Sequence, residues 1–105
     1  MTNKEENPKN LFEQEITSRI NRGIEYLRRN IDTDGLCRDY ESASIGVSDS
    51  WITTCVGAVL AEFDAVPTKM VSSVINLRDQ RGGWGWNGQV PSDADATLRA
   101  LKFLQ

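Results

Sequence analysis

Two aspartates and three tryptophans are the side chains of this sequence best suited to chemistry. Asp93 and Asp95 lie two residues apart, Trp84 and Trp86 lie just before them in a glycine-rich segment, and Trp51 lies earlier in the chain. A carboxyl group held protonated in an apolar cavity, with its acidity tuned by a second carboxylate, can act as a general acid. Tryptophan faces can stack on an apolar or sugar substrate and can stabilise a cation. These residues predict an acid site beside an aromatic wall.

The same residues also fit a purely structural interpretation. Ser92 would cap a helix, Asp95 would be the capping-box acid three residues later, and Asp93 would meet the positive end of the helix dipole. On a regular helix the two aspartates diverge by about 200°, so they converge on one site only if the first turn is distorted. Trp84 and Trp86 would fill the space between helix pairs, where burial of an indole contributes about 2–3 kcal/mol. Both interpretations stay open here.

The remaining composition excludes several classes of site. The chain of 105 residues has no histidine, which removes Ser–His and Cys–His nucleophile pairs and zinc sites that need imidazole. Cys37 and Cys55 are too few for a disulfide scaffold, and the sequence shows no secretory signal, so we expect two reduced thiols. They show no CxxC spacing, which argues against a metal or redox role. We expect neither a metal site nor an organic cofactor.

Charge and hydropathy limit the partners and the location. The net charge of −3 argues against a nucleic-acid partner, because that binding depends on a basic surface. No apolar run reaches the roughly 18 residues of a membrane span, although peripheral membrane contact stays open. The N-terminus has no apolar stretch of the kind found in signal peptides, which favours a cytoplasmic location.

Apolar residues recur every three or four positions in four segments, which predicts four helices and an all-α fold. The expected inward-facing residues are Phe12, Ile16, Ile20, Ile24, Leu27 and Ile31 in the first helix, Ile52, Cys55, Val56, Val59, Leu60 and Phe63 in the second, Met70, Val71, Val74 and Leu77 in the third, and Ala94, Thr97, Leu98, Leu101 and Leu104 in the fourth. In the first helix acidic residues come early and basic residues come late, as the helix dipole prefers. Residues 38–50 are expected to form a polar loop, and residues 1–10 a disordered lead. Ser48 or Ser50 is the expected cap of the second helix.

The two halves of the chain resemble each other. Gly35 and Gly82 lie 47 residues apart, and each follows a predicted helix. The Ser-Asp pairs that begin at Ser48 and Ser92 lie 44 residues apart, and each precedes another helix. This spacing predicts two helix-pair repeats, about 11–64 and 65–105, within the range of known helical repeats. Such arrays normally need at least three units, so we expect the chain to belong to a longer array, to self-associate, or to bind a partner chain.

These features resemble the prenyltransferase and squalene-oxidase-type repeat. That repeat builds the α/α-toroid superfamily, which includes squalene–hopene cyclases and class II terpene cyclases. The resemblance covers about residues 16–105 and implies two repeats of an incomplete α/α toroid. Gly82 and Trp84 match the family's Q-x-x-x-G-x-W motif, with Arg78 in place of its glutamine, and in the first unit Gly35 alone matches.

The resemblance also implies a reaction. Asp93 matches the first aspartate of the D-x-D-D motif of class II cyclases and Asp95 the central one, whereas Ala96 replaces the last. Asp95 would be the proton donor and Asp93 its hydrogen-bonded neighbour, with the tryptophans at positions 51, 84 and 86 binding substrate. The first functional hypothesis is therefore part of a terpene-cyclase-like isomerase that cyclises an isoprenoid or another apolar small molecule, inactive as an isolated chain.

Two other functions stay open. The second hypothesis is a non-catalytic α/α-repeat module that binds a partner or acts as a scaffold. The third is a toroid-type glycoside-active domain, in which Asp49, Asp93 and Asp95 would act beside the tryptophans. The position of Asp95 separates the first two. Exposure at an ordinary helix start favours the module, and burial with Asp93 against apolar walls favours the acid.

Overall fold

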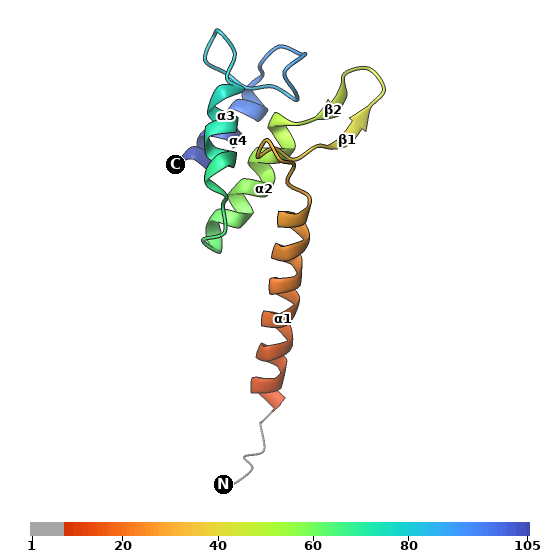
Figure 1. Cartoon of the computed structure of the whole chain (residues 1–105), viewed down its shortest axis with the longest axis vertical. Helices are drawn as coiled ribbons and strands as arrows, with labels where there is room; N and C mark the ends of the chain where they lie inside the picture. The colour runs from red at the N-terminus through yellow and green to blue at the C-terminus, as the bar shows by residue number, and fades with distance from the viewer. Residues whose placement is uncertain (1–7) are drawn as a thin grey trace.

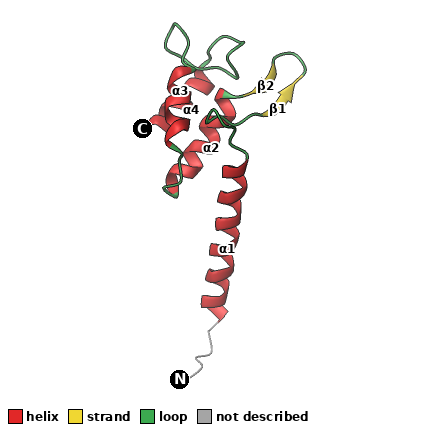
Figure 2. Ribbon diagram, viewed as in Figure 1, coloured by secondary structure: helices red, strands yellow, loops and turns green. Residues whose placement is uncertain are grey.

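Four helices and one short hairpin make up the described part of the chain (Figures 1 and 2). The structure is a computed structural model that describes residues 8–105. The elements in chain order are α1 (Pro8–Arg29), β1 (Asp39–Ser42), β2 (Gly46–Ser48), α2 (Ser50–Glu62), α3 (Thr68–Asn76) and α4 (Ala94–Leu104). The described residues are thus mostly helical, as the apolar periodicity predicts.

The core lies around α2, which packs against both α3 and α4. Leu60 of α2, Met70 and Val74 of α3, and Ala100 and Phe103 of α4 are all buried. Burying an aliphatic side chain of this size contributes about 1.5–3 kcal/mol. The three helices and the turns between them therefore form the stable part of the molecule.

The buried face of α4 differs from the prediction. Leu98 is 67% exposed and Leu101 is 56% exposed, whereas Ala100 and Phe103 are buried. The reason is a close approach of α4 to α2, because a Cβ added at Gly57 would lie 2.3 Å from the Phe103 ring. The apolar periodicity favours leucines, but the close approach favours small side chains facing one aromatic ring.

The same glycine turn follows α1 and α3. Gly35 and Gly82 have φ angles of +87° and +88°, in the left-handed region that glycine adopts without strain. Three residues before each glycine, the backbone N–H of Asp32 or Asp79 donates to the carbonyl of the residue after the glycine, at 2.8 Å in both turns. Each glycine N–H returns a bond to the carbonyl of the same aspartate, at 2.9 and 3.0 Å.

A threonine of the following helix clamps each turn. The Thr53 hydroxyl accepts from the backbone N–H of Cys37 at 2.8 Å and donates to its carbonyl at 3.1 Å. The Thr97 hydroxyl makes the same pair of bonds with Trp84, at 3.0 and 3.2 Å. The two segments that align in the sequence therefore adopt the same local hydrogen-bonded structure.

The prediction of a loop without strands at residues 38–50 is wrong. Strands β1 and β2 pair antiparallel, and a bulge between Asp39 and Glu41 gives Tyr40 a φ of +55°. The hairpin is held from a distance, because the Asn87 side-chain amide donates to the carbonyls of Ile45 and Val47 at 2.7 and 2.9 Å. A residue far along the chain therefore adds hydrogen bonds to the pairing of the two strands.

Helix α1 extends away from the other helices (Figure 1). The structure measures 65 × 29 × 25 Å, and its radius of gyration of 17.8 Å exceeds the roughly 13 Å of a compact chain of this length. No residue of α1 is buried, and its inner end alone, at Ile24 and Leu27, packs against the core. Residues 8–10 of the predicted lead belong to α1, and residues 1–7 lie outside the described part.

Candidate functional site

Three of the five predicted site residues lie together in one cluster at the starts of α2 and α4. We call Tyr40, Trp51, Trp86, Asp95 and Arg99 the Trp51 cluster. The Trp51 indole Nε1 donates to Asp95 Oδ2 at 2.9 Å. Arg99 Nε donates to Asp95 Oδ1 at 3.1 Å. The Asp95 carboxylate therefore joins α4 to α2 through Trp51, and it forms an ion pair with Arg99 within α4.

Aromatic faces complete the Trp51 cluster. The Trp51 and Trp86 rings stack with centroids 5.3 Å apart at an angle of 29°. The edge of Tyr40 meets Trp51 at 6.2 Å, and the Arg99 guanidinium lies 5.0 Å from the centroid of the Trp51 ring. Stacked and edge-to-face rings contribute about 0.5–1.5 kcal/mol per pair beyond burial. An exposed cation over an indole contributes less than a buried one.

The segment after the second glycine turn positions this cluster. The Trp86 carbonyl accepts from the backbone N–H of Asp49 at 3.2 Å, and the Ser48 hydroxyl donates to it at 3.1 Å. The Trp86 indole donates to the carbonyl of Gly46 at 2.9 Å. One tryptophan thereby fixes the end of β2 and the start of α2, which carries Trp51. This long-range link brings residues from both halves of the chain together.

Asp93 and Asp95 do not converge on one site. Asp93 is the N-cap of α4, and its carboxylate accepts from the backbone N–H of Ala96 at 2.7 Å. Asp49 has the equivalent place before α2 and accepts from the N–H of Ser50. The capping role expected for Ser92 therefore belongs to Asp93, because its carboxylate reaches the free amides of the first turn.

The surroundings of Asp95 differ from those of a buried general acid. Its side chain is 61% exposed and forms an ion pair with Arg99. A general acid of the cyclase type needs a protonated carboxyl group among apolar walls. Asp95 lies instead at the surface as the acceptor of the Trp51 and Arg99 hydrogen bonds. This arrangement favours a structural role for Asp95 at the junction of two helices.

Trp84 lies apart from the Trp51 cluster, in the core. Its ring is buried, and its Nε1 donates to the Val74 carbonyl at 2.7 Å. It therefore holds α3 against the second glycine turn. Trp84 has no face available to a substrate, whereas Trp51 and Trp86 are half-buried.

Arg99 and Tyr40 belong to the site although the sequence analysis did not single them out. Arg99 follows Asp95 by four residues, which is the spacing of a helical ion pair and could have indicated it. Tyr40 carries no comparable signal, because its ring reaches Trp51 only through the bulge of the hairpin.

The cysteines occupy separate environments. Burial raises the pKa of the Cys37 thiol to about 11, and the nearby Asp32 carboxylate acts in the same direction. Cys55 is half-buried, with its Sγ 3.5 Å from Arg99 Nη1. Among residues 8–105, no three Cys, Asp or Glu side chains gather closely enough to hold a metal ion.

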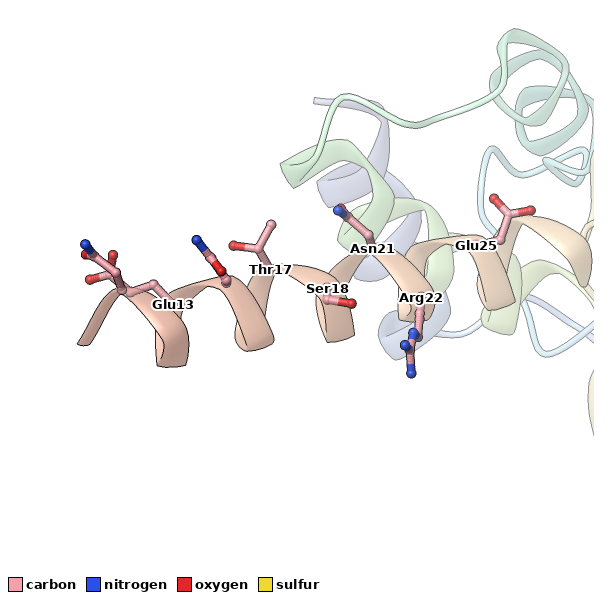
Figure 3. Close-up of a pocket in the computed structure, with 8 residues that line it drawn as sticks. Glu13, Thr17, Ser18, Asn21, Arg22 and Glu25 are labelled. Atoms are coloured by element: carbon pink, nitrogen blue, oxygen red, sulfur yellow. The ribbon is translucent and has the colours of Figure 1, made fainter. Parts of the chain in front are cut away.

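The polar face of α1 forms no enclosed site. Figure 3 shows several of its side chains, among them Glu13, Ser18, Asn21 and Arg22, along one helix, and all the residues that line this surface belong to α1. Side chains from a single helix face do not enclose a ligand.

Comparison with known protein families, curated proteins and solved structures found no match to this chain. Within residues 8–105, every helix is too short or too polar to cross a membrane.

Proposed function

We propose that the chain is a non-catalytic α/α-repeat module in which α1–α2 and α3–α4 are two helix pairs of a toroid-like array. In this proposal the free face of α4 receives a further helix pair, supplied by another segment or a partner chain. The recurrence of the glycine turn and of the threonine clamp supports the assignment of the two pairs.

The observation that carries the proposal is a pair of exposed leucines. Thr54 and Gly57 of α2 are buried, and Gly57 is covered by Phe103 of α4. The residues 44 positions later are Leu98 and Leu101 of α4, which are mostly exposed. The α4 face that corresponds to the covered face of α2 is therefore apolar and uncovered. A helix that stacked on α4 as α4 stacks on α2 would bury both leucines.

The surface position of Asp95 supports this function over the cyclase hypothesis. The exposed Asp95 carboxylate ties α4 to α2 by accepting a hydrogen bond from Trp51, whereas a proton donor to an alkene needs an apolar cavity. Likewise, two of the three aspartates of the glycoside hypothesis, Asp49 and Asp93, cap helices, which argues against that hypothesis. Cyclisation of an isoprenoid by the chain, lost in Asp95→Asn, would favour the cyclase instead.

A tandem protein tests the proposal. A second copy of residues 62–105 is joined directly after Gln105, which repeats the 44-residue spacing between α2 and α4. Stability in repeat arrays adds up through interfaces between neighbours, so the tandem should unfold at a higher temperature than the single chain. Burial of two leucines predicts a Tm increase of roughly 5–10 °C, measured by circular dichroism.

The matched control is the same tandem with Leu98→Glu and Leu101→Glu in the first copy alone. Both residues are exposed in the single chain, so the changes leave its own Tm nearly unaltered. The control tandem should lose the gain in Tm. Equal Tm values for the tandem, its control and the single chain would contradict the proposal.

A further inference from the structure

Helix α1 carries an apolar stripe that nothing in the described chain covers. Phe12, Ile16 and Ile20 recur every four residues on one side of the helix, and they are 63%, 40% and 39% exposed. Isolated helices of fewer than about 12–15 residues are marginal in water, since most helical stability comes from packing of an apolar face. The outer part of α1 therefore has a face that is suited to packing against another helix.

The stripe leads into an apolar groove between α1 and the end of α2. The groove has a volume of about 400 Å³, and its walls include Ile20, Gly23 and Ile24 of α1 and Phe63 of α2. A Cβ added at Gly23 would meet nothing within 4 Å, so the backbone there is open. A large side chain from another helix can enter at this position, as a knob enters a hole.

The order of charges along α1 favours one kind of occupant. Glu15 precedes Arg19 and Arg22, and at 100° per residue all three lie on the same side of the stripe. If two copies of α1 pair antiparallel, Glu15 of each copy lies beside Arg19 and Arg22 of the other. In a parallel pair this side of one helix would face the opposite side of the other, so these opposite charges would not meet.

We propose that a second copy of this chain binds antiparallel along α1 to form a symmetric dimer. Phe12 of each copy enters the open position at Gly23 of the other, and Ile16 packs against Ile20. The apolar contacts supply the affinity, because exposed ion pairs contribute about 0–1 kcal/mol each. The charges select the antiparallel orientation. This surface is separate from Leu98 and Leu101 of α4.

Light scattering of the full chain over a range of concentrations tests the dimer. The unaltered chain should reach twice the monomer mass, and Ile16→Glu should remain a monomer with unchanged helix content. Ser18→Glu and Asn21→Glu are matched controls on the polar face that Figure 3 shows, and both should still dimerise. Leu98→Glu with Leu101→Glu should also dimerise. A monomeric unaltered chain, or loss of the dimer in any control, would overturn the proposal.

Charge exchange tests the orientation. Arg19→Glu with Arg22→Glu should weaken self-association by about tenfold or more, because Glu15 then faces acidic residues of the second copy. Glu15→Arg should weaken it in the same way. An equimolar mixture of the two variants should restore the dimer, because every contact again joins opposite charges. If the double arginine variant associates as tightly as the unaltered chain, the antiparallel arrangement is wrong.

Discussion

The two helix–turn–helix units share a backbone and differ in the residue that the turn holds. Both turns have a glycine with positive φ and a clamping threonine. The clamped residue is Cys37 in the first unit and Trp84 in the second. The Trp84 indole donates to the Val74 carbonyl of α3, whereas the thiol of Cys37 is a much smaller side chain with a weak donor. Accordingly α3 buries two side chains, and α1 buries none.

This difference separates two roles within one unit. The glycine and the threonine fix the path of the turn, because they satisfy its backbone hydrogen bonds. In the second unit the clamped side chain also ties the preceding helix to the turn, because the Trp84 indole donates to the Val74 carbonyl. A unit can therefore keep its turn while its first helix extends away, as α1 does. Changes made at equivalent positions of the two units test this division.

The largest difference is expected between Trp84→Ala and Cys37→Ala. Loss of a buried tryptophan should lower the free energy of unfolding by about 3–5 kcal/mol. Loss of the small thiol should lower it by about 1 kcal/mol. Urea unfolding followed by circular dichroism measures both. If Trp84→Ala proves too unstable to fold, Trp84→Phe should still lose more than Cys37→Ala. Equal losses would show that the two residues have the same role.

The two glycines provide the next comparison. A side chain at positive φ costs about 1–2 kcal/mol, and both Gly35→Ala and Gly82→Ala carry this strain. At Gly35 the added Cβ would also lie 2.9 Å from the Lys69 carbonyl, whereas at Gly82 it would meet nothing within 4 Å. Gly35→Ala should therefore lower the urea midpoint further than Gly82→Ala. The opposite order would argue against crowding between Gly35 and Lys69.

The threonine clamps should differ less. Thr53→Val leaves the buried backbone groups of Cys37 without partners, which costs about 1–3 kcal/mol. Thr97 is half-buried, so water can replace part of what Thr97→Val removes. The loss in unfolding free energy should be smaller at Thr97. A larger loss there would indicate that the second turn depends more on its clamp than on Trp84.

The smallest effect concerns alkaline pH and the first unit alone. The folded chain keeps the pKa of Cys37 at about 11, above its ordinary value of 9.0, because burial disfavours the thiolate. The resulting stability is fully present below pH 9 and falls as the pH rises through 11. In a Cys55→Ser background, Cys37→Ala should therefore lose less unfolding free energy between pH 7 and pH 10 than the chain that keeps Cys37. Equal losses in the two proteins would show that Cys37 does not cause the fall in stability at alkaline pH.

The helices and the glycine turns could be predicted from the sequence, and the packing of α4 could not. Periodicity and the two glycines are local signals, and both turns form where the glycines stand. The periodicity of α4 suggested Leu98 and Leu101 as its buried face, but Ala96 is buried instead. That choice depends on how closely α4 approaches α2, which a single segment does not encode. The hairpin depends in the same way on the distant Asn87.

Three residues of the Trp51 cluster could be selected from the sequence, but their arrangement could not be predicted. Trp51, Trp86 and Asp95 lie together, although they were selected for their chemical types. Sequence spacing could not show that Trp84 turns into the core, because burial of an indole depends on the helix that it meets. Nor could it show whether Ser92 or Asp93 caps α4, because serine and aspartate are comparable caps.

Gly57 has a consequence for the shape of any longer assembly. On α2 its bare backbone lets the Phe103 ring of α4 lie against it. The corresponding position on α4 is Leu101. A helix laid on α4 in the same manner would meet an isobutyl group and would stand further out. The step from α4 to the added helix would then be wider than the step from α2 to α4.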